Sequence, residues 1–234
     1  MSLGFIVEPC YGDFQVVRFV ENEGSLYTLN FEIFSSKTLQ WKEDSVSFDY
    51  PAGTMVGFCY AVPCKQIIYW LDCNRILAYD SSQSDGENEE TIRCRLIDLP
   101  SDRAFYDKEI LGMIAVCQDK LHYLLPSNIS LILHFWELRK YNNGGEGEWF
   151  LLHRIRYDEV NPALLPPIFP LALHPFNPDL VFLRRPGGIL ALIDLRRRLA
   201  KNLVLLPDIT WYTTFAFVLP TWPTPVPQIS PTPV

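Results

Sequence analysis

The chain has 234 residues, enough for a sizeable core, and all-β folds of this size often form one domain. Its hydrophobic fraction (48%) and charged fraction (20%) are ordinary for a folded protein, whereas its aromatic fraction (14%) is high, and strands favour aromatic residues. The formal net charge of −7 argues against a general nucleic-acid binder, which needs a basic face to displace counterions from phosphates. A group of arginines is interpreted as solvated loop and edge-strand charges: Arg184, Arg185, Arg196, Arg197 and Arg198.

The sequence shows no targeting or membrane signal. Residues 1–5 lack the basic and apolar regions of a secretory peptide. The apolar run at residues 127–136 is far shorter than the roughly 18 residues that a membrane helix needs. We therefore expect a cytoplasmic or nuclear location. The cysteines form no C-x-x-C pair and are predicted to be buried and reduced: Cys10, Cys59, Cys64, Cys73, Cys94 and Cys117.

Apolar residues occur in runs of four to seven, often alternating with polar residues, and helical periodicity is nearly absent. This pattern predicts an all-β fold. The first two sets of predicted strands are residues 4–8, 14–20, 28–35 and 41–48, then 55–61, 66–71, 75–79 and 92–99. The next two sets are residues 110–117, 120–124, 131–138 and 149–157, then 168–174, 180–183, 189–194 and 201–205. A further strand is predicted at residues 213–219.

Four sets of four strands, at a spacing of roughly fifty residues, are the pattern expected of β-propeller blades. The third strand of each set is hydrophobic, carries or ends at an acidic residue, and precedes a polar turn, as at residues 76–80. Trp41 and Trp149 open the fourth strand of two sets. A ring at that position can lie between adjacent blades while its N–H finds a partner. The alternative interpretation is that these strands are hairpins of a β-sandwich.

Two segments lie outside the strand pattern. Residues 80–91 are polar and acidic, and are predicted to form a mobile loop between two strands of the second blade. Residues 220–234 are rich in proline, which cannot donate to a strand ladder. We predict that they form an extended, disordered tail after a propeller domain at residues 1–219. Such tails can also bind aromatic grooves on partners.

Motifs for catalysis or ligand binding are nearly absent. No Gly-x-Ser-x-Gly, Walker or dinucleotide motif occurs, and the glycines at residues 144–147 join two strands. The histidines lack metal-ligand spacing, although His122 and His134 could approach each other across a hairpin; the set is His122, His134, His153 and His174. The adjacent carboxylates are interpreted as solvated loop charges: Glu43 with Asp44, Glu87 with Glu89 and Glu90, and Asp158 with Glu159. We therefore predict no catalytic, cofactor-binding or metal-binding residue and no cofactor.

Several segments carry, in order, the motifs of a known family. Residues 32–41 read Glu-Ile-Phe-Ser-Ser-Lys-Thr-Leu-Gln-Trp, and residues 76–80 read Ile-Leu-Ala-Tyr-Asp, with Arg-Leu-Ile-Asp-Leu-Pro following at 95–100. Residues 112–123, and then Trp-Glu-Leu at 136–138 with Trp-Phe-Leu-Leu-His-Arg at 149–154, continue the series, and His-Pro opens the loop at 174–179. These motifs together resemble the plant F-box associated domain over most of residues 1–219.

The resemblance implies a kelch-like β-propeller that binds the protein to be ubiquitinated by a cullin-type ubiquitin ligase. In that family an N-terminal helical F-box binds the ligase adaptor. No Leu-Pro-rich helical segment precedes the predicted strands, so we expect this chain to lack the F-box and the earlier blades. On this expectation target binding is retained, whereas the chain has no evident site for the ligase adaptor.

Two questions about assembly and function stay open at this point. The four blades either close as a ring, with residues 213–219 joining the first blade, or form an open arc with exposed edges. The predicted function is protein binding through loops at one propeller face, with neither general nucleic-acid nor membrane binding. Trp70 and Trp211 are candidate interface residues that can equally pack between blades. The alternatives are a hydrolase on a propeller scaffold and a truncated remnant without function.

Overall fold

The computed structural model describes residues 3–7, 14–20, 27–49, 61–71, 75–81, 94–100, 112–127, 129–139, 147–161, 164 and 167–205. These residues form four separate antiparallel sheets, each a simple meander of four consecutive strands. The first sheet comprises β1 (Leu3–Val7), β2 (Phe14–Val20), β3 (Thr28–Ser35) and β4 (Gln40–Ser47). The second comprises β5 (Ala61–Cys64), β6 (Ile67–Leu71), β7 (Arg75–Asp80) and β8 (Cys94–Asp98).

The third sheet comprises β9 (Met113–Cys117), β10 (Lys120–Ser127), β11 (Ile132–Arg139) and β12 (Glu148–Arg156), and the short helix α1 (Tyr157–Val160) follows it. The fourth comprises β13 (Phe169–Leu173), β14 (Leu180–Arg185), β15 (Ile189–Asp194) and β16 (Leu199–Leu205). The predicted grouping into four sets of four strands is thus confirmed. The described strands form four sheets of four strands each and not the two face-to-face sheets of a β-sandwich.

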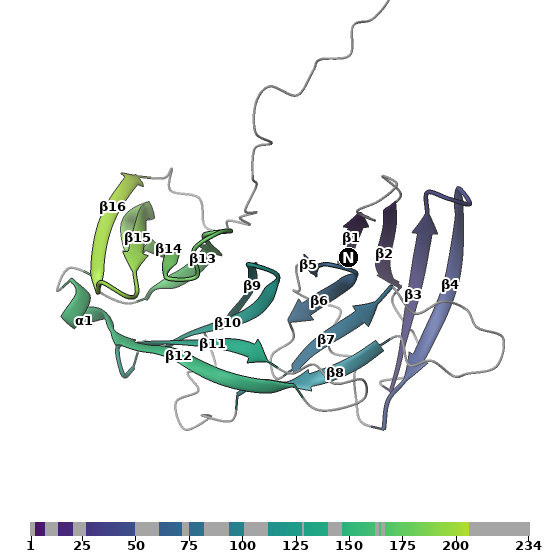
Figure 1. Cartoon of the computed structure of the whole chain (residues 1–234), viewed down its shortest axis with the longest axis horizontal. Helices are drawn as coiled ribbons and strands as arrows, with labels where there is room; N and C mark the ends of the chain where they lie inside the picture. The colour runs from purple at the N-terminus through teal and green to yellow at the C-terminus, as the bar shows by residue number, and fades with distance from the viewer. Residues whose placement is uncertain are drawn as a thin grey trace, which may run out of the picture.

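The four sheets follow one another along an arc (Figure 1). Their first strands lie on the inner side, where β1 contacts β5 and β6, β5 contacts β9, and β9 and β10 contact β13. Their last strands, β4, β8, β12 and β16, lie on the outer side (Figure 1). The first and fourth sheets stand at opposite ends, so the described sheets form an open arc, as one of the two arrangements considered above predicts.

The burial pattern of each strand follows its place in the arc. In the end sheets, β3 and β14 alternate between buried and half-buried residues, because only one face of each sheet meets a neighbouring described sheet. In the middle sheets, the central residues of β7 and β11 are buried in an unbroken run, since both faces are covered. The sequence anticipates this difference: Asn30 and Glu32 interrupt β3, whereas residues 76–79 of β7 are all apolar.

The predicted strand at residues 55–61 shares only Ala61 with β5, which spans Ala61–Cys64 and includes Pro63. Among the described strands β5 pairs with β6 alone, so one of its sides needs no donor and proline is tolerated. Residues 55–60, the extra strand at 213–219, the predicted loop at 82–91 and the proline-rich tail lie outside the described residues.

The other strand prolines obey the same rule. Pro126 pairs with Leu133 of β11 but lies beyond Leu124, the last residue of β10 that pairs with β9. Pro170 lies on the edge strand β13, beside an irregularity in its pairing with β14. Each described strand proline therefore stands where one side of the backbone needs no hydrogen bond from an N–H.

Candidate functional site

The structure separates the residues that could have formed a metal or catalytic site. His122 lies opposite Glu137 in the β10–β11 pairing, whereas His134 lies opposite Leu125. His122 stacks on Phe135, and because adjacent strand residues face opposite sides, His134 points to the other face. The suggested approach of His122 to His134 is therefore wrong. Within the described residues, no group of three His, Cys, Asp or Glu side chains is placed to hold a metal ion.

The adjacent carboxylates are held by ion pairs or separated by the strand geometry. Asp158 forms an ion pair with Arg156 (2.7 Å), and Glu159 pairs with Arg198 of the fourth sheet (3.1 Å) and lies 3.8 Å from the Arg156 guanidinium. Glu43 and Asp44 are successive residues of the outer strand β4, and their side chains face opposite sides of it. Glu87, Glu89 and Glu90 lie outside the described residues.

The tryptophan predictions have mixed outcomes. Trp149 packs against the core between the second and third sheets, and its Nε1–H donates to the carbonyl oxygen of Asp98 in β8 (2.8 Å). This confirms the prediction of an inter-blade ring with a partner for its N–H. Trp41, in contrast, is 50% exposed on β4, where the Arg18 guanidinium lies 4.7 Å from its ring centre. Trp70 is buried between the first two sheets and cannot be an exposed interface residue, and Trp211 lies outside the described residues.

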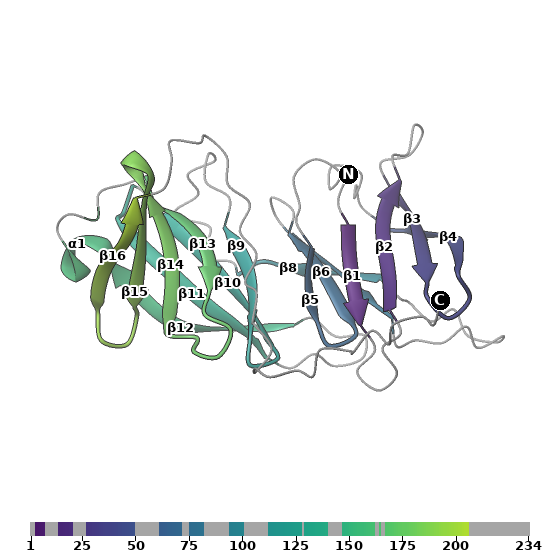
Figure 2. The ribbon, with the colours of Figure 1, turned by 90° about the horizontal axis from the view of Figure 1, so that it is seen from above.

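The strongest candidate for a functional surface is a row of turns at one face of the arc. Figure 2 shows the β5–β6, β9–β10, β13–β14 and β15–β16 turns at the same face, the lower one in that view. The first three are linked side by side. Lys65 of the β5–β6 turn lies 3.9 Å from the Asp119 carboxylate of the β9–β10 turn. Gln118 of that turn donates through Nε2 to the carbonyl oxygen of Phe176 (3.0 Å) in the β13–β14 turn. We call this surface the turn face.

The β9–β10 turn has only two residues between its strands. Gln118 and Asp119 both have positive φ, at 51° and 58°, the conformation that a tight hairpin of this twist requires. Glycine, asparagine or aspartate usually occupies such positions, because a longer side chain is strained there. Gln118 is such a longer residue, so its positive φ costs conformational energy. The same side chain donates the hydrogen bond that links the third sheet to the fourth.

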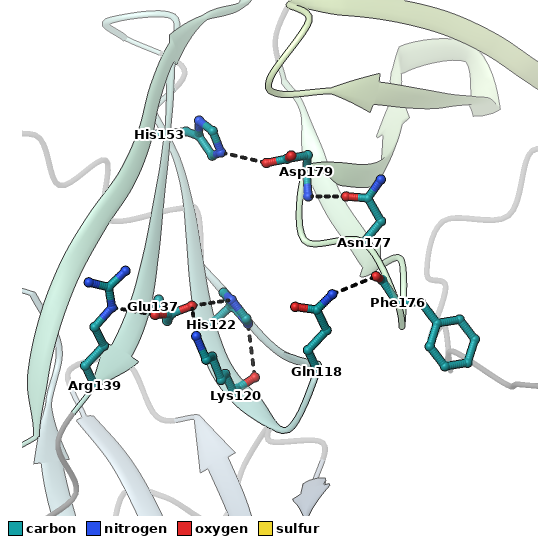
Figure 3. Close-up of polar contacts among 9 residues, drawn as sticks. All are labelled: Gln118, Lys120, His122, Glu137, Arg139, His153, Phe176, Asn177 and Asp179. Atoms are coloured by element: carbon teal, nitrogen blue, oxygen red, sulfur yellow. Dashed lines mark hydrogen bonds and ion pairs between the residues drawn. The ribbon is translucent and has the colours of Figure 1, made fainter.

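Phe176 stands exposed on this face. The residue is 64% exposed, and Figure 3 shows its ring directed away from the polar contacts of Gln118, Asn177 and Asp179. Its backbone is held from both sides: its N–H donates to His174 Nδ1 (3.2 Å), and its carbonyl accepts from Gln118. A fixed backbone lowers the conformational entropy that is lost when a partner binds the ring.

A pocket of about 470 Å³ lies beside Phe176, between the β13–β14 and β15–β16 turns. Within it, Asn177 Oδ1 accepts the backbone N–H of Asp179 (3.0 Å), and Asp194 Oδ1 accepts that of Arg197 (2.8 Å). Both turns are therefore closed by their own side chains. The pocket is lined by carboxylate, amide and guanidinium groups around one apolar residue: Asn177, Asp179, Leu180, Asp194, Arg196 and Arg197.

Polar contacts between the third and fourth sheets fix the position of these turns (Figure 3). His153 Nε2 of β12 lies 3.0 Å from the Asp179 carboxylate, so the pocket wall is tied to the neighbouring sheet. On the same face of the third sheet, the imidazoles of His122 and His153 stack on opposite sides of Phe135, with ring centres 5.1 and 5.8 Å from its own.

Glu137 is the buried carboxylate of this region. Lys120 Nζ donates to its Oε2 (3.1 Å) and Arg139 Nε to its Oε1 (2.5 Å). Burial raises the pKa of Glu137, but the hydrogen bonds from Arg139 and Lys120 outweigh burial and hold the pKa below its usual range. His122 Nε2 lies 3.7 Å from this carboxylate, and burial lowers the pKa of the ring despite the nearby negative charge.

Sequence reasoning missed Gln118, Phe176 and Asp179 as functional candidates. The His-Pro motif at residues 174–175 marks the turn, yet nothing in it indicates that the following aromatic ring is exposed. The His153–Asp179 contact joins residues 26 positions apart in different sheets, and it depends on how the sheets pack. The described cysteines Cys64, Cys94 and Cys117 are free and buried, as predicted.

The described strands form four successive antiparallel meanders along an arc, and their turns lie at one face. This arrangement defines a β-propeller-like protein. The chain belongs to the family described as "F-box protein At3g26010-like, beta-propeller", whose model matches residues 10–204. A curated relative from Arabidopsis thaliana, "Putative F-box/kelch-repeat protein At1g15680", is 26% identical over 181 residues. The match covers 72% of this chain, which spans 40% of the relative's length. The resemblance inferred from the motifs is thus confirmed.

A solved structure titled "Crystal structure of HIRA(644-1017)" aligns with 86% of this chain and 55% of its own, with a TM-score of 0.36 and 9% sequence identity. A likeness at that level bears on neither fold nor function. In the described part of the chain, no helix has the length and apolar character needed to cross a membrane.

Proposed function

We propose that the chain is a protein-binding domain that presents a client protein to a cullin-type ubiquitin ligase, and that it acts by binding and not by catalysis. Membership of an F-box/kelch propeller family supports the general role in protein interaction. The ligase connection and the client are the finer parts of the proposal, and so is a site of action in the cytoplasm or nucleus.

The observation that carries the proposal is the turn face with Phe176 fixed upon it. Aromatic side chains dominate the binding energy of protein interfaces, and complete burial of a phenylalanine contributes about 1.5–3 kcal/mol. The ring stands beside a pocket whose charged lining can select polar groups of a client. The hydrogen bonds from Gln118 and His174 hold the backbone of Phe176, so binding does not have to order this turn.

The test begins with affinity capture from plant cell extracts, using the whole chain as bait. Clients that are recovered are then purified, and their dissociation constants are measured against the wild type and two variants. Phe176→Ala should weaken a client that binds the turn face by about tenfold or more. The matched control is Ile129→Ala, because Ile129 is an exposed apolar residue at the β10–β11 turn, at the opposite end of the third sheet.

The two levels of the proposal have separate outcomes. A direct client that binds both variants as tightly as the wild type would show that the turn face is not the binding site. Failure to recover any direct, saturable client would overturn the role in protein binding. Recovery of ligase subunits together with the client supports the ligase connection, whereas a client without them indicates a standalone binder.

A further inference from the structure

The outer strand β16 differs from the other outer strands of the arc. Natural sheets protect exposed edges with charged side chains, and β4 carries Lys42, Glu43 and Asp44 in succession. In β16 only Lys201 is charged. Three large apolar side chains of β16 are exposed, at 61% for Leu199, 42% for Leu203 and 50% for Val204. Among the described residues, β4 and β12 expose one such side chain each, Trp41 and Leu151, and β8 exposes none.

The backbone of β16 is also available along one side. The strand pairs with β15 and has no neighbour on its other side among the described strands. Pairing is regular from Leu199 to Asn202, opposite residues 194–191 of β15. The register then shifts so that Val204 pairs with Leu190, and Leu203 is left as a bulge. Such a bulge interrupts the edge, which limits an added strand to a short segment beside residues 199–202.

The charge around this edge is positive in a chain whose net charge is −7. Arg196, Arg197, Arg198 and Lys201 are all exposed, at the turn before β16 and on the strand itself. Asp194 lies 3.8 Å from Arg197, and Glu159 pairs with Arg198. Among the described residues, Arg196 and Lys201 have no acidic partner.

The chain's own following segment does not supply that partner. Residues 206–234 contain one acidic residue, Asp208, and no other charged side chain. A strand that complements this edge must offer several carboxylates beside the basic residues, and apolar side chains beside Leu199 and Val204. Residues 82–91 of the chain are acidic but contain no apolar side chain to place beside Leu199 and Val204. The requirements therefore point to a segment of a different protein.

We propose that β16 is a docking edge for an extended acidic segment of a partner protein, which pairs with residues 199–202 as a fifth strand of the fourth sheet. Backbone hydrogen bonds hold the added strand, as in other cases of strand addition, and the basic residues select an acidic sequence. The proposal deepens the proposed protein-binding function and rests on it, but uses an edge of the fourth sheet that is separate from Phe176.

The test measures binding of a fluorescein-labelled peptide, Asp-Leu-Glu-Val-Asp-Leu-Glu, to the whole chain by fluorescence anisotropy. A peptide of the same sequence with an N-methyl group on every internal residue keeps every side chain but offers no internal N–H to the ladder from either edge. Saturable binding of the first peptide and loss of binding by the N-methylated one are the expected results. Equal affinity for both peptides would mean simple charge attraction and would overturn strand pairing, as would absence of saturable binding.

A pair of variants locates the edge. Lys201→Glu should weaken binding of the unmodified peptide by about fivefold, since it turns an attractive charge into a repulsive one. Arg154→Glu makes the same change at an exposed position of the outer strand β12 and should leave the affinity unchanged. If both variants weaken binding equally, the peptide responds to net charge and the assignment to β16 is wrong.

Hydrogen–deuterium exchange provides the remaining control. The amides in residues 199–202 that face β15 are protected by that pairing, whereas those that face away from it should become protected only when the unmodified peptide is added. Protection of the outward-facing amides without peptide would mean that the edge is occupied by the chain itself or by a second copy. Light scattering at the same concentration separates these cases, and either result overturns the proposal. A client that Lys201→Glu and the wild type bind equally would also contradict it, while leaving the proposed protein-binding function intact.

Discussion

The interface between the first and second sheets and the interface between the third and fourth sheets are filled by different kinds of side chain. The first is almost wholly apolar, formed by Val17, Leu29, Phe31, Ile33, Ile68, Trp70, Leu77, Tyr79 and Cys94. The second also has an apolar centre, which includes Phe135 and Leu183, but His153–Asp179 and Gln118–Phe176 contacts cross it. Apolar burial is non-directional, whereas hydrogen bonds require a defined geometry. The first interface therefore holds two sheets together, and the second also sets the positions of the turns on the proposed binding face.

The largest expected effect comes from a cavity in the apolar interface. Phe31 is buried against Tyr79, with ring centres 6.2 Å apart, and Phe31→Ala should lower the free energy of unfolding by about 3–4 kcal/mol. Urea denaturation measures this loss. Because the side chains of this interface carry no charge at neutral or mildly acidic pH, the loss should be the same at about pH 5 and about pH 8.

The matched variant is Phe34→Ala, on the opposite face of the same strand. Phe34 is half-buried and contacts Phe14 and Trp41, so the loss should be about 1 kcal/mol. Equal losses for Phe31→Ala and Phe34→Ala would show that the first interface contributes no more than the outward face of β3. That result would contradict the claim that apolar burial in the first interface holds the first two sheets together.

The next effect tests the polar cluster on the third sheet. Glu137→Gln removes the charge that Lys120 and Arg139 share, and should lower the free energy of unfolding by about 2 kcal/mol. Glu43→Gln, at an exposed position of β4, makes the same chemical change and should stay within about 0.5 kcal/mol of the wild type. Urea denaturation at neutral pH measures the free energy of unfolding of both variants. If Glu137→Gln unfolds with the same free energy as the wild type, the buried carboxylate adds nothing to stability.

The pH dependence of stability should arise from the buried polar residues of the third sheet, His122 and Glu137. Burial lowers the pKa of His122, so the unfolded chain takes up a proton more readily than the folded one, and stability falls as pH drops below about 6.5. The lowered pKa of Glu137 acts in the same direction at more acidic pH, because its stabilisation is lost as pH falls through the folded pKa. The ring of His122 faces both Glu137 and Lys120. The negative charge of Glu137 raises the pKa of the ring, and the positive charge of Lys120 lowers it.

His122→Phe should therefore flatten the decline in the urea midpoint between about pH 7 and pH 5, while keeping the stack on Phe135. Phe31→Ala serves as the control, since it should lower the midpoint throughout and keep the slope of the wild type. An unchanged slope in His122→Phe would assign the pH dependence to other groups.

The apolar interfaces were largely predictable from the sequence, and the polar contacts were not. Alternation in β3 and the unbroken apolar run in β7 follow from how many faces of each sheet are covered, so periodicity alone predicted both strands. Trp149 was placed correctly because a tryptophan opening a fourth strand fits between sheets. Trp41 has the same local pattern, yet its sheet is the end of the arc and its ring stays half exposed. The position of a sheet in the arc depends on packing over distances that a local motif does not record.

The smallest effect concerns Gln118, where strain and contact oppose each other. Gln118→Ala keeps the positive φ and loses the hydrogen bond to the Phe176 carbonyl, so stability should fall by about 1 kcal/mol. Gln118→Gly loses the same bond but relieves the strained φ, which is worth about 1 kcal/mol, so stability should return to near that of the wild type. Hydrogen–deuterium exchange at residues 174–179 should nevertheless rise in both variants, because neither can hold the β13–β14 turn. If Gln118→Gly is as unstable as Gln118→Ala, the turn stores no strain. If exchange is unchanged in both, the inter-sheet bond does not position Phe176, and the difference between the two interfaces lies in the His153–Asp179 contact alone.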